Sequence, residues 1–263
     1  MMKRMIETSC YTSVGSRSGQ QDAVYVTDGE IWDDSADGLH RQIAVLCDGM
    51  GGMTDGARAS ETAVTTMAYA FDRIRDSETV NLRSFLESSI VSLDRTIHEF
   101  PRESGRGSGT TMVCVLTDGD LFYTAAAGDS RIYFIHGNRM LRLTRDHNHD
   151  LRLKLWLSEG LITKEQYEQE GKKEALISFL GVGDISLMDI PEKPGKLISG
   201  DMILLCSDGV TNTLSEQDVL RILMSGESLG EMCERIVESA VSKNPNSQDN
   251  TSVILLRYLE ELL

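Results

Sequence analysis

The chain has 263 residues and a formal charge of -15, from 26 basic and 41 acidic side chains. A negative surface repels nucleic acid and anionic membranes, so we expect neither as the main partner. The content of 40% hydrophobic and 25% charged residues is that of a folded globular protein and excludes a disordered or fibrous chain. The 5 cysteines form no C-x-x-C pair, and no apolar run approaches the ~18 residues of a membrane span, so we expect a cytoplasmic protein with free thiols.

Short apolar runs predict β-strands along most of the chain. In chain order, these runs cover residues 23–27, 42–47, 110–116, 121–127, 131–135, 202–206 and 252–256. Apolar residues at a spacing of three to four predict helices over 56–75, 81–100 and 229–242. The Asp118-Gly119 and Gly137-Asn138 steps predict tight hairpins, so consecutive strands should be antiparallel.

This order of elements predicts an α+β fold in which two packed antiparallel sheets are flanked by helices. Because the chain contains no linker, repeat or low-complexity tract, we expect a single domain over residues 1–263. A polar, helical stretch at about 146–184 interrupts the strand-rich region and predicts an insertion over one edge, which we call the flap. Its sequence fits a segment that contacts substrate and fits a plain surface excursion equally well.

Aspartates stand at the ends of several predicted strands: Asp48, Asp129 and Asp208 close strands, while Asp22 opens one and Asp249 precedes another. Any one Asp-Gly step alone indicates only a turn. Several buried strands that each deliver a carboxylate to the rim of the core, however, place negative charges where they need cations. Oxygen ligands without histidine or cysteine clusters favour Mg²⁺ or Mn²⁺ over zinc.

The motifs around these aspartates resemble, in type and order, those of the metal-dependent protein phosphatases, the PPM or type 2C Ser/Thr phosphatases, in their bacterial form. The matching segments are Arg17 five residues before Asp22, DGMGG (48–52), GTT (109–111), GDSR (128–131), LTRDH (143–147), CSDG (206–209) and QDNTSV (248–253). They extend from residue 15 to residue 256, which is almost the entire chain.

The resemblance implies a four-layer α/β/β/α sandwich with a binuclear Mn²⁺ or Mg²⁺ site, and a third ion in bacterial members. Asp22 would act through a water molecule, Gly49 through its carbonyl oxygen, and Asp129 with Asp208 at the third ion. The implied metal ligands are Asp22, Asp48, Gly49, Asp129, Asp208 and Asp249.

The implied activity is hydrolysis of phosphoserine and phosphothreonine by water activated at the metals. Asp48 and Asp208 would serve catalysis, and Arg17 would hold the phosphate through a bidentate fork. The partners would be phosphorylated proteins made by a Ser/Thr kinase. We expect a monomer.

Two departures from the family pattern concern the mechanism. Gln20 and Gln21 replace an Asn and a Glu, and Met50 and Met53 stand where relatives commonly have a histidine suspected of protonating the leaving alkoxide. Loss of such a general acid costs on the order of 10²–10⁴ in rate. A metal-bound water or His147 could substitute, although the His147 side chain could instead cap the flap.

These departures leave two alternative functions open. The methionines favour a weakly active or inactive relative that binds phosphoproteins as a regulatory module. Because nothing in the motifs distinguishes a protein from a metabolite, a phosphatase for small phosphate esters is the other alternative.

Overall fold

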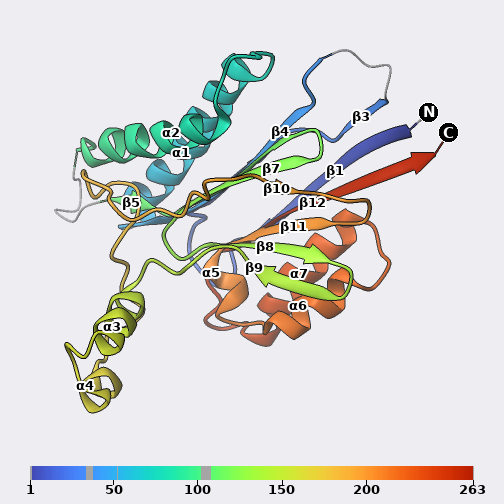
Figure 1. Ribbon diagram of the computed structural model, residues 1–263. Helices are drawn as coiled ribbons and strands as arrows, with labels where there is room; N and C mark the ends of the chain where they lie inside the picture. Colours follow the sequence, from blue (N-terminus) through green and yellow to red (C-terminus); the bar gives the residue numbers. More distant parts are fainter. Residues whose placement is uncertain (1, 34–37, 52, 102–107, 263) are drawn as a thin grey trace.

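Two antiparallel sheets pack face to face, and helices cover their outer faces (Figure 1). The computed structural model describes residues 2–33, 38–51, 53–101 and 108–262. Within these residues the first sheet has six strands in the order β3-β1-β12-β11-β8-β9. Their bounds are β1 Met2–Ser13, β3 Glu30–Asp33, β8 Arg131–His136, β9 Arg139–Arg142, β11 Met202–Cys206 and β12 Thr251–Leu262.

The second sheet has the order β10-β7-β6-β4-β2, with β5 paired to β4. Its bounds are β2 Asp22–Val26, β4 Arg41–Met50, β5 Gly109–Thr110, β6 Met112–Asp118, β7 Leu121–Ala127 and β10 Gly195–Lys196. In β4 every residue from 42 to 47 is buried, as expected for a strand with a core on both faces.

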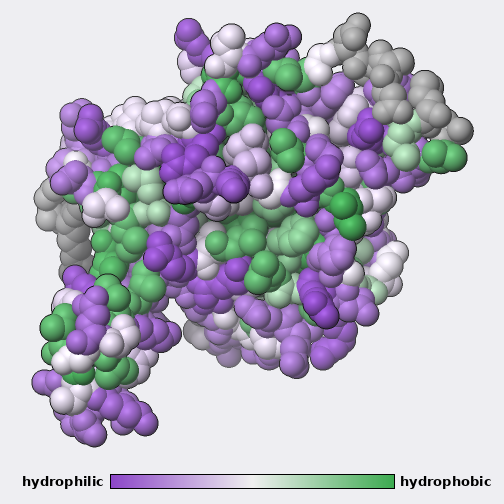
Figure 2. Space-filling model, viewed as in Figure 1, coloured by the Kyte–Doolittle hydropathy of each residue, from purple (hydrophilic) through white to green (hydrophobic). Residues whose placement is uncertain are grey.

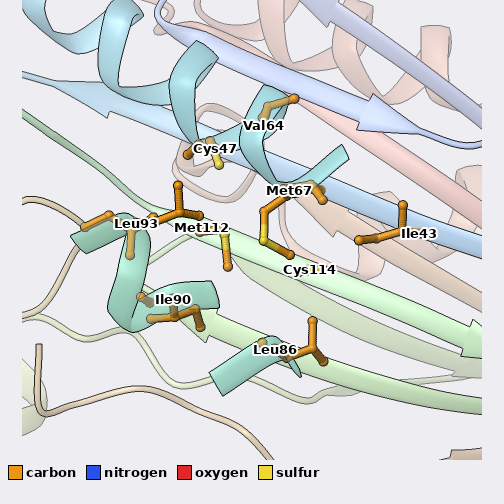
Figure 3. Packing of buried hydrophobic residues seen from close by; sticks show 14 of the residues in the cluster. Ile43, Cys47, Val64, Met67, Leu86, Ile90, Leu93, Met112 and Cys114 are labelled. Atoms are coloured by element: carbon orange, nitrogen blue, oxygen red, sulfur yellow. The ribbon is translucent and has the colours of Figure 1, made fainter. Parts of the chain in front are cut away.

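The helices complete the four layers, which confirms the predicted fold class. Helices α1 (Met53–Ile74) and α2 (Leu82–His98) pack on the second sheet, where Met67, Met112 and Cys114 meet (Figure 3). Apolar side chains of α5 (Asp208–Thr211), α6 (Glu216–Leu223) and α7 (Leu229–Lys243) pack on the first sheet. A third apolar cluster lies between the sheets. Among the described helices, none is long and apolar enough to cross a membrane.

The N-terminal strand β1 shows where sequence patterns were insufficient. Its residues are mostly polar, and only Ile6 is buried, so no apolar run marks it. It nevertheless pairs along its whole length with β12, from Met2 opposite Leu262 to Ser13 opposite Thr251. Pairing with a buried central strand, rather than its own pattern, makes this segment a strand.

The flap projects from the sandwich as two short helices, α3 (His149–Ser158) and α4 (Lys164–Gln169) (Figure 1). Asn148 caps α3, and a capping box from Thr163 begins α4. Only Leu153 is buried among the residues of α3. Figure 2 shows hydrophobic residues exposed on this lobe among hydrophilic ones.

A buried carboxylate fixes the end of the flap to α2. Asp94, 1% exposed, accepts backbone N–H bonds of 2.8 Å from Gly181, 3.0 Å from Gly183 and 3.0 Å from Ile185. The neighbouring Leu180 exchanges backbone hydrogen bonds with Thr110. The end of the flap is therefore connected to β5, next to the end of β4.

Candidate active site

Sheet pairing brings the predicted aspartates to one end of the sandwich. Asp22 at the start of β2 lies opposite Asp48 near the end of β4. Asp208 directly follows β11, and Asp249 lies just before β12, which pairs with β11. Asp129 lies in the turn between β7 and β8. We call these five side chains the carboxylate rim.

Burial and mutual repulsion affect the ionisation of these groups. Burial, and then the charges of Asp22, Asp208, Asp129 and Asp249, raise the pKa of Asp48 well above its usual range. Burial raises the pKa of Asp22 to about 6 and that of Asp129 to about 7, and Asp208 contributes to both shifts. The rim thus concentrates negative charge that a cation would stabilise.

Asp22 has one satisfied and one unsatisfied oxygen. Ser207 donates a hydrogen bond of 2.9 Å to Oδ2, and the backbone N–H of Ser252 donates in turn to the Ser207 hydroxyl at 3.0 Å. The buried Oδ1 has no hydrogen-bond partner within the described part of the chain. A buried carboxylate oxygen without a donor, among other carboxylates, suits a hard cation or its water ligand.

The GTT motif holds the backbone of Asp48 in place. The Asp48 carbonyl accepts from the Thr110 hydroxyl at 2.9 Å and from the Thr111 N–H at 2.8 Å, and its N–H donates to the Thr111 hydroxyl at 3.0 Å. At Gly49 a Cβ atom would stand 2.2 Å from the Gly56 carbonyl oxygen. Only glycine fits there, because backbone surrounds it.

Arg17 lies at the rim but is bound to one of its carboxylates. Its guanidinium contacts Asp249 with Nε–Oδ1 2.8 Å and Nη2–Oδ2 2.6 Å, and its side chain is 59% exposed. The adjacent Ser16 is fixed by a backbone bond of 2.9 Å to Gln248. Among the described residues, no three His, Cys, Asp or Glu side chains stand ready to hold a metal ion. Asp249 would have to leave Arg17 to join such a group.

The structure supplies no proton donor at Met50, where relatives commonly have a histidine, and it buries the candidate donor His147. Met50 ends β4 opposite Gly109, and the side chain of Met53 lies outside the described residues. His147 is 0% exposed, so its ring cannot reach a substrate in this arrangement. The side chain is part of the interior, which favours the structural interpretation of His147 over the catalytic one.

A cavity of about 540 Å³ lies between the rim and the flap. Asp129 and Asp208 line it from the rim, and Lys173 and Glu174 line it from the flap. Arg131, also in the wall, is held by a bidentate pair with Asp146 at 3.0 and 2.9 Å. The predicted site included Asp129 and Asp208 but not Arg131, Asp146, Lys173 or Glu174, although Arg131 and Asp146 belong to the GDSR and LTRDH motifs.

The arrangement agrees with comparisons of the chain with known proteins. Residues 17–243 match the Protein phosphatase 2C family. The chain belongs to this family. Protein phosphatase PhpP of Streptococcus pneumoniae is 33% identical over 225 residues, which are 84% of this chain and 87% of that protein.

Solved phosphatases of this kind share the type 2C fold seen here. The serine/threonine phosphatase of S. agalactiae has a TM-score of 0.80 and 28% identity, covering 96% of this chain and 99% of that one. The catalytic domain of the phosphatase PstP, solved in complex with 2 manganese ions, has a TM-score of 0.74 and 24% identity, covering 97% and 99%. The predicted family and fold are confirmed.

Proposed function

We propose that this type 2C family member is a metal-dependent protein phosphatase that hydrolyses phosphoserine and phosphothreonine. The observation that carries the proposal is the carboxylate rim, in which burial and mutual repulsion raise the pKa of Asp48, Asp22 and Asp129. Such a cluster is costly for folding and is useful as a binding site for divalent cations. The named phosphatase PhpP supports the substrate class.

The oxygen donors of the rim fit Mn²⁺ or Mg²⁺. Asp48, Asp208 and Asp249 would hold two ions directly with the Gly49 carbonyl, Asp22 would act through water, and Asp129 with Asp208 would hold a third. The unsatisfied Oδ1 of Asp22 supports its part in this set. Manganese in the PstP structure supports the choice of ion.

Two divalent cations at the rim would offset phosphoryl charge and make water a better nucleophile. Arg17 would exchange Asp249 for two phosphate oxygens, since its planar fork suits either partner. Its guanidinium side chain is 59% exposed and therefore accessible to a substrate. The cavity beside the rim would receive the residues that flank the phosphorylated side chain.

A phosphothreonine peptide tests this proposal directly. We expect Mn²⁺-dependent turnover that stops with chelator, and a loss of about 10³-fold in kcat for Asp208→Ala. Asp72→Asn, which changes an exposed aspartate of α1, is the matched control. Full activity of Asp208→Ala at saturating Mn²⁺ would remove the rim from the mechanism. A panel of phosphorylated metabolites, tested beside the peptide, distinguishes a small-ester phosphatase.

Met50 favours a second candidate, a weakly active relative that binds phosphoproteins. No histidine lines the cavity in the described part of the chain. If a missing general acid limits turnover, Met50→His should raise kcat on the phosphothreonine peptide by at least about 10-fold. It should leave p-nitrophenyl phosphate turnover unchanged, because that leaving group needs no proton. An unchanged peptide rate would show that the methionine is no deficit.

We further propose that the substrates are proteins phosphorylated by a Ser/Thr kinase in the cytoplasm, and that the enzyme acts as a monomer. All of the cysteines are free, and Cys47, Cys114, Cys206 and Cys233 are buried. Free buried thiols are typical of proteins from reducing compartments.

A further inference from the structure

The turn that carries Asp129 is joined to His147 by two hydrogen bonds. The His147 N–H donates to the Gly128 carbonyl at 2.9 Å, and the Gly128 N–H donates to His147 Nδ1 at 3.2 Å. Gly128 has φ +106°, and a Cβ there would stand 2.6 Å from the Thr111 side chain. The turn is therefore confined between His147 and the threonine that also holds Asp48.

The other side of the imidazole faces Asp189. Because Nδ1 accepts from a backbone N–H, the ring proton is on Nε2, which lies 3.3 Å from Asp189 Oδ1. Asp189 is itself fixed by a backbone pair with Ala126 at 2.9 and 3.0 Å and by the guanidinium of Arg145. The ring is oriented by its hydrogen bond with Gly128 and is enclosed, with 0% of its residue surface exposed.

The backbone of His147 joins the two ends of the flap. Its carbonyl accepts from Ile177 at 2.9 Å and from Ser178 at 3.4 Å, and the next residue, Asn148, forms a bridge with Leu176. The chain enters α3 shortly after His147 and comes back beside His147 at Ile177. One residue therefore contacts the base of the flap and the turn that bears Asp129.

We propose that His147 is a positioning residue that couples the flap base to the Asp129 turn, so that cation binding at Asp129 and the placement of the flap stabilise each other. The inference rests on the proposed role of Asp129 as a metal ligand. His147 touches no substrate, and its effect passes through Gly128. By linkage, the coupling acts in both directions.

Hydrogen exchange of the flap base, followed in segment 174–180 with and without Mn²⁺, tests the coupling. In the wild type, Mn²⁺ should slow exchange of the Ile177 and Ser178 amides. His147→Phe, which removes both ring contacts, should abolish this Mn²⁺ effect and raise the Mn²⁺ concentration for half activation by about 10-fold. His147→Asn should recover most of it, since its amide oxygen can accept from Gly128. His136→Asn, at a distant exposed histidine, is the control.

Asp129→Asn keeps the proposal testable if His147→Phe does not fold. Reciprocity requires that this change also remove the Mn²⁺ effect on the Ile177 and Ser178 amides. The coupling alone would be overturned if Mn²⁺ leaves the exchange rate of these amides in the wild type unchanged while calorimetry shows that the ion is bound. Absence of Mn²⁺ binding by the wild type would overturn the proposed function together with it.

Discussion

The backbone of Asp48 is fixed by hydrogen bonds to Thr110 and Thr111, whereas Leu161, between the two flap helices, is 65% exposed. The rim is built on strand ends inside the sandwich, and the flap is attached mainly at its base. Reacting groups need positions fixed within a fraction of an ångström, which strands supply. A surface that contacts different proteins can adapt to them when it has few contacts with the core, as is the case for a projecting helix pair.

The largest expected effect separates the rim from ordinary surface aspartates. Asp48→Asn should lower kcat on a phosphothreonine peptide by about 10³-fold. The metal-free variant should also melt at a higher temperature than the wild type, because a buried charge that faces other carboxylates is removed. Calorimetric melting with and without Mn²⁺ measures this, and a lower melting temperature of the metal-free variant would contradict the repulsion.

The anchor of the flap should be the next most sensitive feature. Asp94→Ala leaves the N–H groups of Gly181, Gly183 and Ile185 without their acceptor, and should lower the free energy of unfolding by about 3 kcal/mol. Urea unfolding gives this value. Glu87→Ala, on the same helix but with a side chain that is 47% exposed, should stay within about 0.5 kcal/mol. Equal losses of unfolding free energy in the two variants would show that the hydrogen bonds of Asp94 do not stabilise the protein specifically.

The carboxylate of Asp189 should make the stability of the protein depend on pH in the acid range. Burial acts to raise the pKa of Asp189, but His147 and Arg145 outweigh it and lower the pKa below the usual range. Its contribution to stability is therefore present above the unfolded pKa of about 4 and is lost as pH falls through and below that value. Between pH 5 and pH 3, the free energy of unfolding should fall by about 1 kcal/mol less in Asp189→Asn than in the wild type, after allowance for solvent screening. Urea unfolding at the two pH values measures this difference. An equal fall in the free energy of unfolding of both proteins would contradict this role of Asp189.

The smallest effect should come from the exposed flap surface. Leu161→Ser should change the free energy of unfolding by less than about 0.5 kcal/mol, since the side chain packs against little. If the flap meets protein substrates, KM for a phosphoprotein should rise while KM for p-nitrophenyl phosphate stays constant. If Leu161→Ser leaves KM for the phosphoprotein at the wild-type value, the flap is only a surface excursion.

Most of the sandwich could be predicted because its strands carry their own signals. The predicted β7 and β11 runs match the observed strands, since apolar residues fill both. Strand β1 was missed because most of its residues are polar, and helix α6 was missed because it is short. Of the residues that line the cavity, Asp129 and Asp208 were predicted, whereas Lys173 and Glu174 were missed, because only the path of the flap brings them there.

The sequence by itself determined the order of the motifs, the aspartates at strand ends and the family, because these depend on residue types at short spacings. Only the tertiary structure decided that Arg17 binds Asp249, 232 residues away, and that His147 is buried between Gly128 and Asp189. Strand order and register set such contacts, and both arise from packing of the whole sandwich rather than from any local pattern.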